Sequence, residues 1–132
     1  MSRRELREQI FKLLFRIEFN DEAEMPEQMA LFFAEEEPLE ESVKEEISRK
    51  YTAILEKKGE LDAMLDEKAT GWNVSRMGKV DLTILRLALF EMLYDDAIPV
   101  SVAINEAVEL AKKFGQTESP AFVNGILAKF AN

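Results

Sequence analysis

Apolar residues recur at intervals of three and four along most of the chain, which is the repeat of an α-helix with one buried face. No segment alternates apolar and polar residues as a half-buried strand does, and glycine and proline are few. The pattern therefore predicts an all-α protein of about seven helices. Their expected ranges are residues 3–19, from 26, 39–57, 61–71, 79–94, from 99 and from 119.

Local signals mark the ends of several of these helices. Gly59 is expected to end the third helix, because glycine inside a helix costs about 1 kcal/mol relative to alanine. Gly115 stands at a C-cap position, and Ser119 followed by Pro120 is typical of an N-cap and a first helical turn. Trp72 lies in the turn before the fifth helix, where we expect it to seal one end of the core.

The predicted helix over residues 79–94 is apolar on nearly every side, which is typical of a central, buried helix. Arg86 interrupts this run, so its guanidinium must either pair with an acidic side chain or reach solvent along its stem. Glu91 and Glu106 are both candidate partners, and the sequence does not separate them.

The composition excludes several classes of function. The chain has 132 residues, enough for one domain, and contains neither cysteine nor histidine. It therefore lacks thiolate chemistry, the commonest general base and the commonest transition-metal ligand. The acidic run over residues 35–46 lacks the glycine and the spacing of a calcium loop, so we expect neither metal nor cofactor. With no signal-peptide block and no membrane-spanning apolar run, we expect a cytoplasmic protein that is neither a membrane protein nor an enzyme.

Charge is distributed unevenly along the chain, whose formal net charge is −9. Residues 18–68 hold 17 acidic against 6 basic side chains, whereas residues 1–16 hold 5 basic against 2 acidic ones. The basic residues Arg3, Arg4 and Arg7 lie at the start of the first predicted helix, where the helix dipole disfavours cations. Their position suggests contact with phosphate groups.

Two sets of aromatic residues leave alternatives open. In the last predicted helix, Phe122, Asn124 and Gly125 lie off the apolar stripe. Phe122 either packs on a neighbouring helix, with Gly125 permitting close contact, or stacks with Asn124 on an unpaired base. In the first helix, a ridge of three phenylalanines lies apart from the main stripe and is either buried against the second helix or bound by a partner. This ridge comprises Phe11, Phe15 and Phe19.

Four segments together resemble the NusB family of bacterial transcription antitermination factors. They are the arginine-led first helix, LRLALFEML at 85–93, IPVSVAINEAVELAKKFG at 98–115 and FVNGIL at 122–127. The resemblance implies one domain over residues 1–132, built of two packed helical bundles with subdomains 1–71 and 72–132. It further implies an RNA-binding factor that recognises single-stranded boxA RNA together with the small-subunit ribosomal protein NusE. That pair would then join the RNA polymerase elongation complex with other Nus factors.

The resemblance also assigns residues to these two roles. The residues that match the RNA surface of the family are Arg3, Arg4, Arg7, Thr117, Glu118, Ser119, Phe122 and Asn124. Phe15 and Asp81 fall where the family meets its ribosomal-protein partner.

Two other classes of function are weighed against this one. A NusB-like domain also precedes the catalytic domain of some ribosomal-RNA cytosine methyltransferases, so the chain would be an RNA-targeting domain in that case. Alternatively, it is a helical protein–protein adaptor that binds no RNA, with homodimerisation through the phenylalanine ridge left open.

Overall fold

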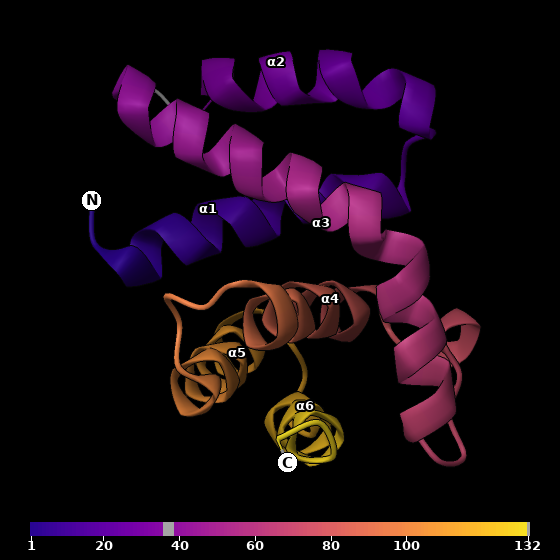
Figure 1. Ribbon diagram of the computed structural model, residues 1–132. Helices are drawn as coiled ribbons and strands as arrows, with labels where there is room; N and C mark the ends of the chain where they lie inside the picture. Colours follow the sequence, from indigo (N-terminus) through magenta and orange to yellow (C-terminus); the bar gives the residue numbers. More distant parts are fainter. Residues whose placement is uncertain (36–38, 132) are drawn as a thin grey trace. The chain divides into compact units, whose positions relative to one another are not determined.

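The computed structural model describes residues 1–35 and 39–131, and over these residues the chain is helical with no strand, which confirms the predicted all-α class (Figure 1). Residues 36–38, which belong to the acidic run, lie outside the described part. The helices are α1 (Arg3–Phe15), α2 (Met25–Glu35), α3 (Glu41–Lys68), α4 (Lys79–Tyr94), α5 (Val100–Phe114) and α6 (Ser119–Ala128). Short 3₁₀ turns cover Arg16–Glu18, Glu22–Glu24 and Val74–Arg76.

The chain forms two compact units, Met1–Leu55 and Glu56–Asn132. They divide inside α3 and not at the turn after Gly71, and the expected subdomains 1–71 and 72–132 stay a prediction. Each unit has its own buried residues and is described by itself below.

A capping box starts α1 in the first unit. The Glu5 amide donates to Ser2 Oγ at 3.0 Å, and the Ser2 amide donates to a Glu5 carboxylate oxygen at 3.3 Å. Hydrogen bonding to the Glu5 carboxyl by the Ser2 side chain, and to a smaller extent by the Ser2 amide, lowers the pKa of Glu5. Ser2 and Glu5 stand three residues apart, a spacing that already marks a helix start in the sequence.

The predicted first helix was too long at its C-terminal end. Regular α-helix stops at Phe15, and a 3₁₀ turn continues from Arg16 to Glu18. The Arg16 carbonyl accepts from the Phe19 amide at 3.1 Å and from Asn20 Nδ2 at 2.9 Å, so two donors satisfy it at the helix end.

Arg16 attaches the end of α1 to α2. Its guanidinium donates to the Gln28 carbonyl at 3.2 Å and to Glu35 Oε2 at 2.6 Å, and it lies over the Phe32 ring at 5.3 Å. Phe32 is almost fully buried. Arg16, which the sequence showed only as one of five basic side chains in residues 1–16, is therefore a packing residue of this unit.

The prediction that Gly59 ends the third helix was wrong. α3 continues through Gly59 to Lys68. The buried residues Ile47, Ile54, Leu61 and Leu65 keep one helical stripe on both sides of the glycine. This continuous apolar stripe outweighs a glycine cost of about 1 kcal/mol, so the predicted third and fourth helices are one.

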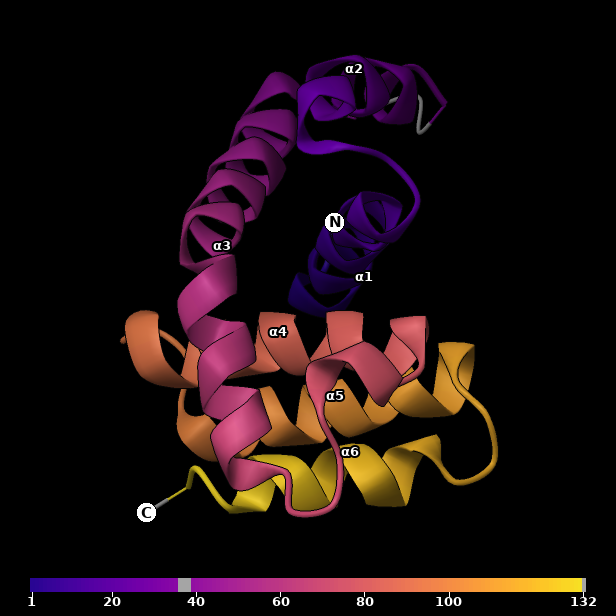
Figure 2. The same cartoon turned by 90° about the vertical axis from the view of Figure 1, so that its right-hand side faces the viewer.

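In the second unit, α4 is the buried helix that its sequence predicted. Every residue from Leu82 to Glu91 is buried. Figure 2 shows α4, α5 and α6 side by side, with the segment after α3 passing over α6 on its way to α4. This arrangement brings the N-terminal ends of α4 and α6 near the C-terminal end of α5.

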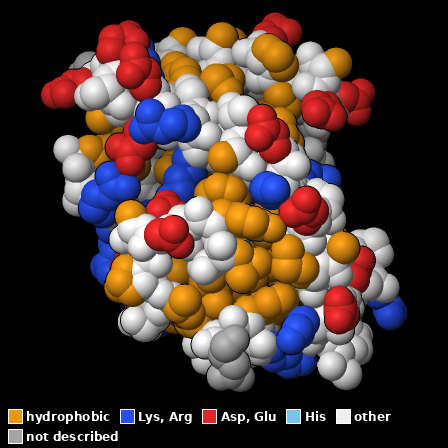
Figure 3. Space-filling view, viewed as in Figure 1, with side chains coloured by type: hydrophobic (Ala, Val, Ile, Leu, Met, Phe, Trp, Pro, Cys, Tyr) orange, Lys and Arg blue, Asp and Glu red, His pale blue; other side chains and the backbone are white. Residues whose placement is uncertain are grey.

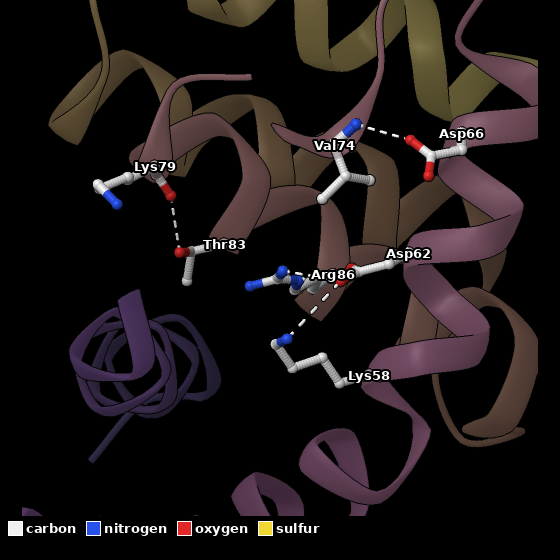
Figure 4. A network of polar contacts seen from close by, with 7 residues as sticks. All are labelled: Lys58, Asp62, Asp66, Val74, Lys79, Thr83 and Arg86. Atoms are coloured by element: carbon white, nitrogen blue, oxygen red, sulfur yellow. Dashed lines mark hydrogen bonds and ion pairs between the residues drawn. The ribbon is translucent and has the colours of Figure 1, made fainter. Parts of the chain in front are cut away.

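Arg86 pairs with Asp62 of α3, a residue that the sequence analysis did not consider (Figure 4). Arg86 Nε and Nη2 donate to the two carboxylate oxygens at 2.7 and 2.9 Å, a two-pronged geometry that favours strong pairing. Lys58 adds a second cation 3.8 Å from Asp62 Oδ2. The predicted need for an acidic partner is thus met by a residue 24 positions earlier.

The surface of this unit mixes charged and apolar side chains (Figure 3). Its exposed large apolar residues include Leu93 and Tyr94 at the end of α4 and Val100 at the start of α5. None of the described helices is both long enough and apolar enough to cross a membrane.

Candidate functional site

The turn between α5 and α6 is held by Ser119. This side chain is buried, and its Oγ accepts a hydrogen bond from the Gln116 amide at 2.9 Å. A Cβ on Gly115 would lie 2.6 Å from Ser119 Cβ and Oγ, so only glycine fits there. The N-cap of α6 is Glu118 and not Ser119, which corrects the predicted helix start by one residue. Ser119 organises the turn from inside, whereas Thr117 and Glu118 are exposed.

Phe122 forms an aromatic pair with Trp72. Their ring centroids are 5.4 Å apart in an edge-to-face arrangement, with an interplanar angle of 72°. Phe122 is half-buried, and Trp72 is 51% exposed. Trp72 therefore does not seal the core as expected, because its ring lies on the surface against α6. The sequence did not predict this pairing, because its only signal was the presence of the tryptophan, which does not indicate a partner.

Asn124 and Gly125 lie on the exposed side of α6. No atom would come within 4 Å of a Cβ added at Gly125. The interpretation that this glycine permits close helix contact was therefore wrong, and its exposed position leaves room for a molecule outside the chain.

A groove of about 400 Å³ lies beside the aromatic pair. We call it the Trp72 groove. It is lined by Trp72 and Phe122, by residues 77–81 at the start of α4, and by Phe114, Gly115, Gln116, Glu118 and Ser119 around the turn. Three residues of predicted RNA contact, Glu118, Ser119 and Phe122, thus share a groove with Asp81, a residue of predicted partner contact. Asp81 is half-buried.

The arginines of α1 differ in exposure. The Arg3 side chain is 70% exposed, and its Nη1 lies 2.8 Å from Glu46 Oε2. Arg4 is also exposed, whereas Arg7 is buried, with 9% of its surface accessible. Arg3 and Arg4 are the two whose guanidinium groups a phosphate can reach, and Arg7 belongs to the packed side of the helix.

The phenylalanine ridge forms a continuous series of ring contacts. The Phe11 and Phe15 rings are stacked with centroids 6.0 Å apart, and Phe19 meets Phe15 edge-to-face at 5.0 Å. Phe11 is buried, Phe15 is half-buried and Phe19 is 61% exposed. The inner end of the ridge is therefore core, and the outer end presents an aromatic surface next to Phe15.

The predicted site residues fall into both compact units. Arg3, Arg4, Arg7 and Phe15 belong to the first unit, whereas the turn, Phe122, Asn124 and Asp81 belong to the second. Within residues 1–35 and 39–131, no three acidic side chains gather as a group that could hold a metal ion.

The sequence model of the NusB family matches residues 4–132. The chain belongs to the NusB family. This match includes the acidic middle segment, which lies outside the four segments that carried the resemblance. A relative from Agathobacter rectalis called "Transcription antitermination protein NusB" is 54% identical over 99% of this chain and 100% of its own length.

Solved structures of the family have the same fold. NusB of T. maritima superposes with a TM-score of 0.89 at 34% identity, covering 99% of this chain and 91% of that one. A second structure, described as antitermination factors NusB and NusE in complex with dsRNA, has a TM-score of 0.85. At 21% identity, over 98% of this chain and 95% of that one, it supports the fold alone.

Proposed function

We propose that this protein is a transcription antitermination factor that binds single-stranded boxA-type RNA together with the ribosomal protein NusE. The pair would act in the cytoplasm on the RNA polymerase elongation complex with other Nus factors and support ribosomal RNA transcription. Family membership and the name of the A. rectalis relative support this function. The observation that carries it is the partly exposed Phe122 beside Trp72, an aromatic surface of the kind on which unpaired bases stack.

The RNA surface would combine positioning by charge with stacking by aromatics. Arg3 and Arg4 would contact phosphates, while Arg7 would hold the start of α1 in place by packing. Phe122 would stack on a base, with Asn124 hydrogen bonding its edge, and Thr117 and Glu118 would flank the strand. Ser119 would contribute by holding the turn on which these residues stand.

NusE would bind through Phe15 and Asp81. Phe15 offers a half-buried ring in contact with the exposed Phe19, and Asp81 offers a carboxylate at the start of α4. Family membership supports the choice of this class of partner.

The proposed role requires no catalysis. The chain contains neither a cysteine nucleophile nor a histidine base. Methyl transfer to ribosomal RNA by the purified chain would contradict this part of the proposal.

Fluorescence anisotropy tests the proposal directly. A labelled boxA-like RNA and a scrambled RNA of equal length are titrated with the chain, with and without NusE. We expect preference for the boxA-like RNA, strongest with NusE present, because linked surfaces share one cost of association. Equal binding of both RNAs in both conditions would refute the function.

Two substitutions test whether the RNA binds at the proposed surface. Phe122→Ala and Asn124→Ala are expected to weaken binding, by about 1–3 kcal/mol for the stacking residue. Thermal unfolding of each variant is the control. If Phe122→Ala mainly lowers the melting temperature and spares RNA binding, the residue is a packing residue only.

A further inference from the structure

We propose that the Trp72 groove binds one guanine base of the RNA, stacked on Trp72 and hydrogen bonded to the Glu118 carboxylate. This inference rests on the proposed function and extends it, because it names a stacking residue outside the family motifs and the base that is read. It is built from the aromatic pair, the groove and the polar side chains that line it.

Trp72 is placed for stacking. Half of its surface is exposed, and its contact with Phe122 is edge-to-face, which leaves a ring face uncovered by this partner. The indole N–H forms no hydrogen bond among the described residues. An exposed aromatic ring beside a groove of about 400 Å³ offers a surface on which a base can stack.

The polar side chains of the groove favour a base edge over a phosphate. Asp81 and Glu118 line it, and their carboxylates form no hydrogen bond or ion pair within the described part of the chain. Carboxylates only accept hydrogen bonds at neutral pH and repel phosphates, so they select an edge with N–H donors. Lys79 lines the same groove and supplies a cation for the phosphate of the bound nucleotide.

Guanine fits this requirement better than the other bases. Its N1–H and N2–H₂ groups are adjacent, so together they match the two oxygens of one carboxylate. Adenine and cytosine place an acceptor nitrogen beside their amino group, and uracil places carbonyl oxygens on both sides of its N–H. These acceptors would face a carboxylate and repel it.

The single tryptophan of the chain makes the test specific, because intrinsic tryptophan fluorescence reports Trp72 alone. A boxA-like RNA is titrated into the chain, with and without NusE, while fluorescence and anisotropy are recorded. We expect RNA binding to quench the fluorescence. Trp72→Ala is expected to weaken binding roughly 5- to 150-fold, whereas Trp72→Phe keeps most of the affinity. Tyr94→Ala, which removes an exposed aromatic outside the groove, is the matched control and should bind as the wild type does.

The base is tested with RNAs in which each guanosine in turn is replaced by inosine, which lacks the N2 amino group. One replacement is expected to weaken binding about tenfold. The variant Glu118→Gln should bind the guanosine and inosine RNAs equally, because the paired acceptor oxygens are gone.

The outcomes separate this inference from the proposed function. If the wild type shows no RNA preference with or without NusE, the proposed function fails. If the wild type prefers boxA-like RNA but Trp72→Ala binds equally well at an unchanged melting temperature, the stacking role of Trp72 is refuted. If every inosine RNA binds as tightly as its parent, the guanine assignment is refuted.

Discussion

Among single residues, Tyr51 carries a polar atom that the fold leaves without a partner. The side chain is buried in the first unit, and its hydroxyl forms no hydrogen bond among the described residues. Burial, and to a smaller extent the nearby Glu22 carboxylate, raises the pKa of Tyr51. The buried hydroxyl therefore costs desolvation without a compensating hydrogen bond.

Removing this hydroxyl should stabilise the protein. Tyr51→Phe is expected to raise the free energy of unfolding by about 1 kcal/mol at pH 7, measured by urea denaturation. Because the folded state raises the pKa of Tyr51, folding favours the neutral phenol. The free energy of unfolding of the wild type is therefore unaffected by this group below the ordinary pKa of 10.0 and falls as pH rises beyond that value. Tyr51→Phe should lack that part of the alkaline loss. Tyr94→Phe is the control, since its exposed hydroxyl already donates to Glu60 at 3.0 Å. A less stable Tyr51→Phe would contradict the prediction.

Sequence reasoning succeeded at residues whose environment is set by their own helix. It recognised that Arg86 needs an acidic partner, since the guanidinium interrupts an apolar run. It did not find Asp62, because that pairing depends on which side of α3 meets α4. Pairing between helices far apart in sequence leaves no periodic signal.

At the level of helices and turns, glycines of opposite roles look alike in the sequence. Gly59 and Gly125 lie inside helices with no atom within 4 Å of an added Cβ, whereas a Cβ on Gly115 would meet Ser119 and the Ala111 carbonyl within 2.8 Å. Gly59 was read as a helix end, yet of these three glycines it is Gly115 that stands at the end of a helix. Space around the backbone, which the sequence does not report, separates the two roles.

Alanine substitutions should divide the three glycines accordingly. Gly59→Ala and Gly125→Ala are each expected to raise the free energy of unfolding by up to about 1 kcal/mol, through helix propensity. Gly115→Ala should lower it by about 1–3 kcal/mol, because the turn must shift to admit the methyl group. Thermal and urea unfolding measure all three. A stabilising Gly115→Ala would show that the turn accommodates a side chain.

For the molecule as a whole, the net charge of −9 opposes RNA binding, so local cations must supply the attraction. Arg3 is the most clearly exposed of them, although it also pairs with Glu46. Each phosphate of a single-stranded RNA that a protein cation neutralises adds about 0.7 to the magnitude of the slope of log affinity against log salt concentration.

Arg3→Gln should therefore reduce the salt dependence of RNA affinity. We expect the magnitude of the slope to fall by about 0.7 in anisotropy titrations over a range of salt concentrations. Arg49→Gln makes the same change in net charge at an exposed position outside the proposed surface, and should leave the slope as in the wild type. Equal effects of the two variants would mean that only total charge matters.

The sequence by itself determined the all-α class, the buried central helix α4 and the turn between α5 and α6. These features follow from helical periodicity and from capping residues, which act over a few positions of the chain. Only the tertiary structure decided that α3 is continuous, that Arg86 pairs with Asp62, and that Trp72 lies on the surface against Phe122. Each depends on which helix faces meet, and contacts across dozens of residues are selected by packing of the whole unit rather than by local pattern.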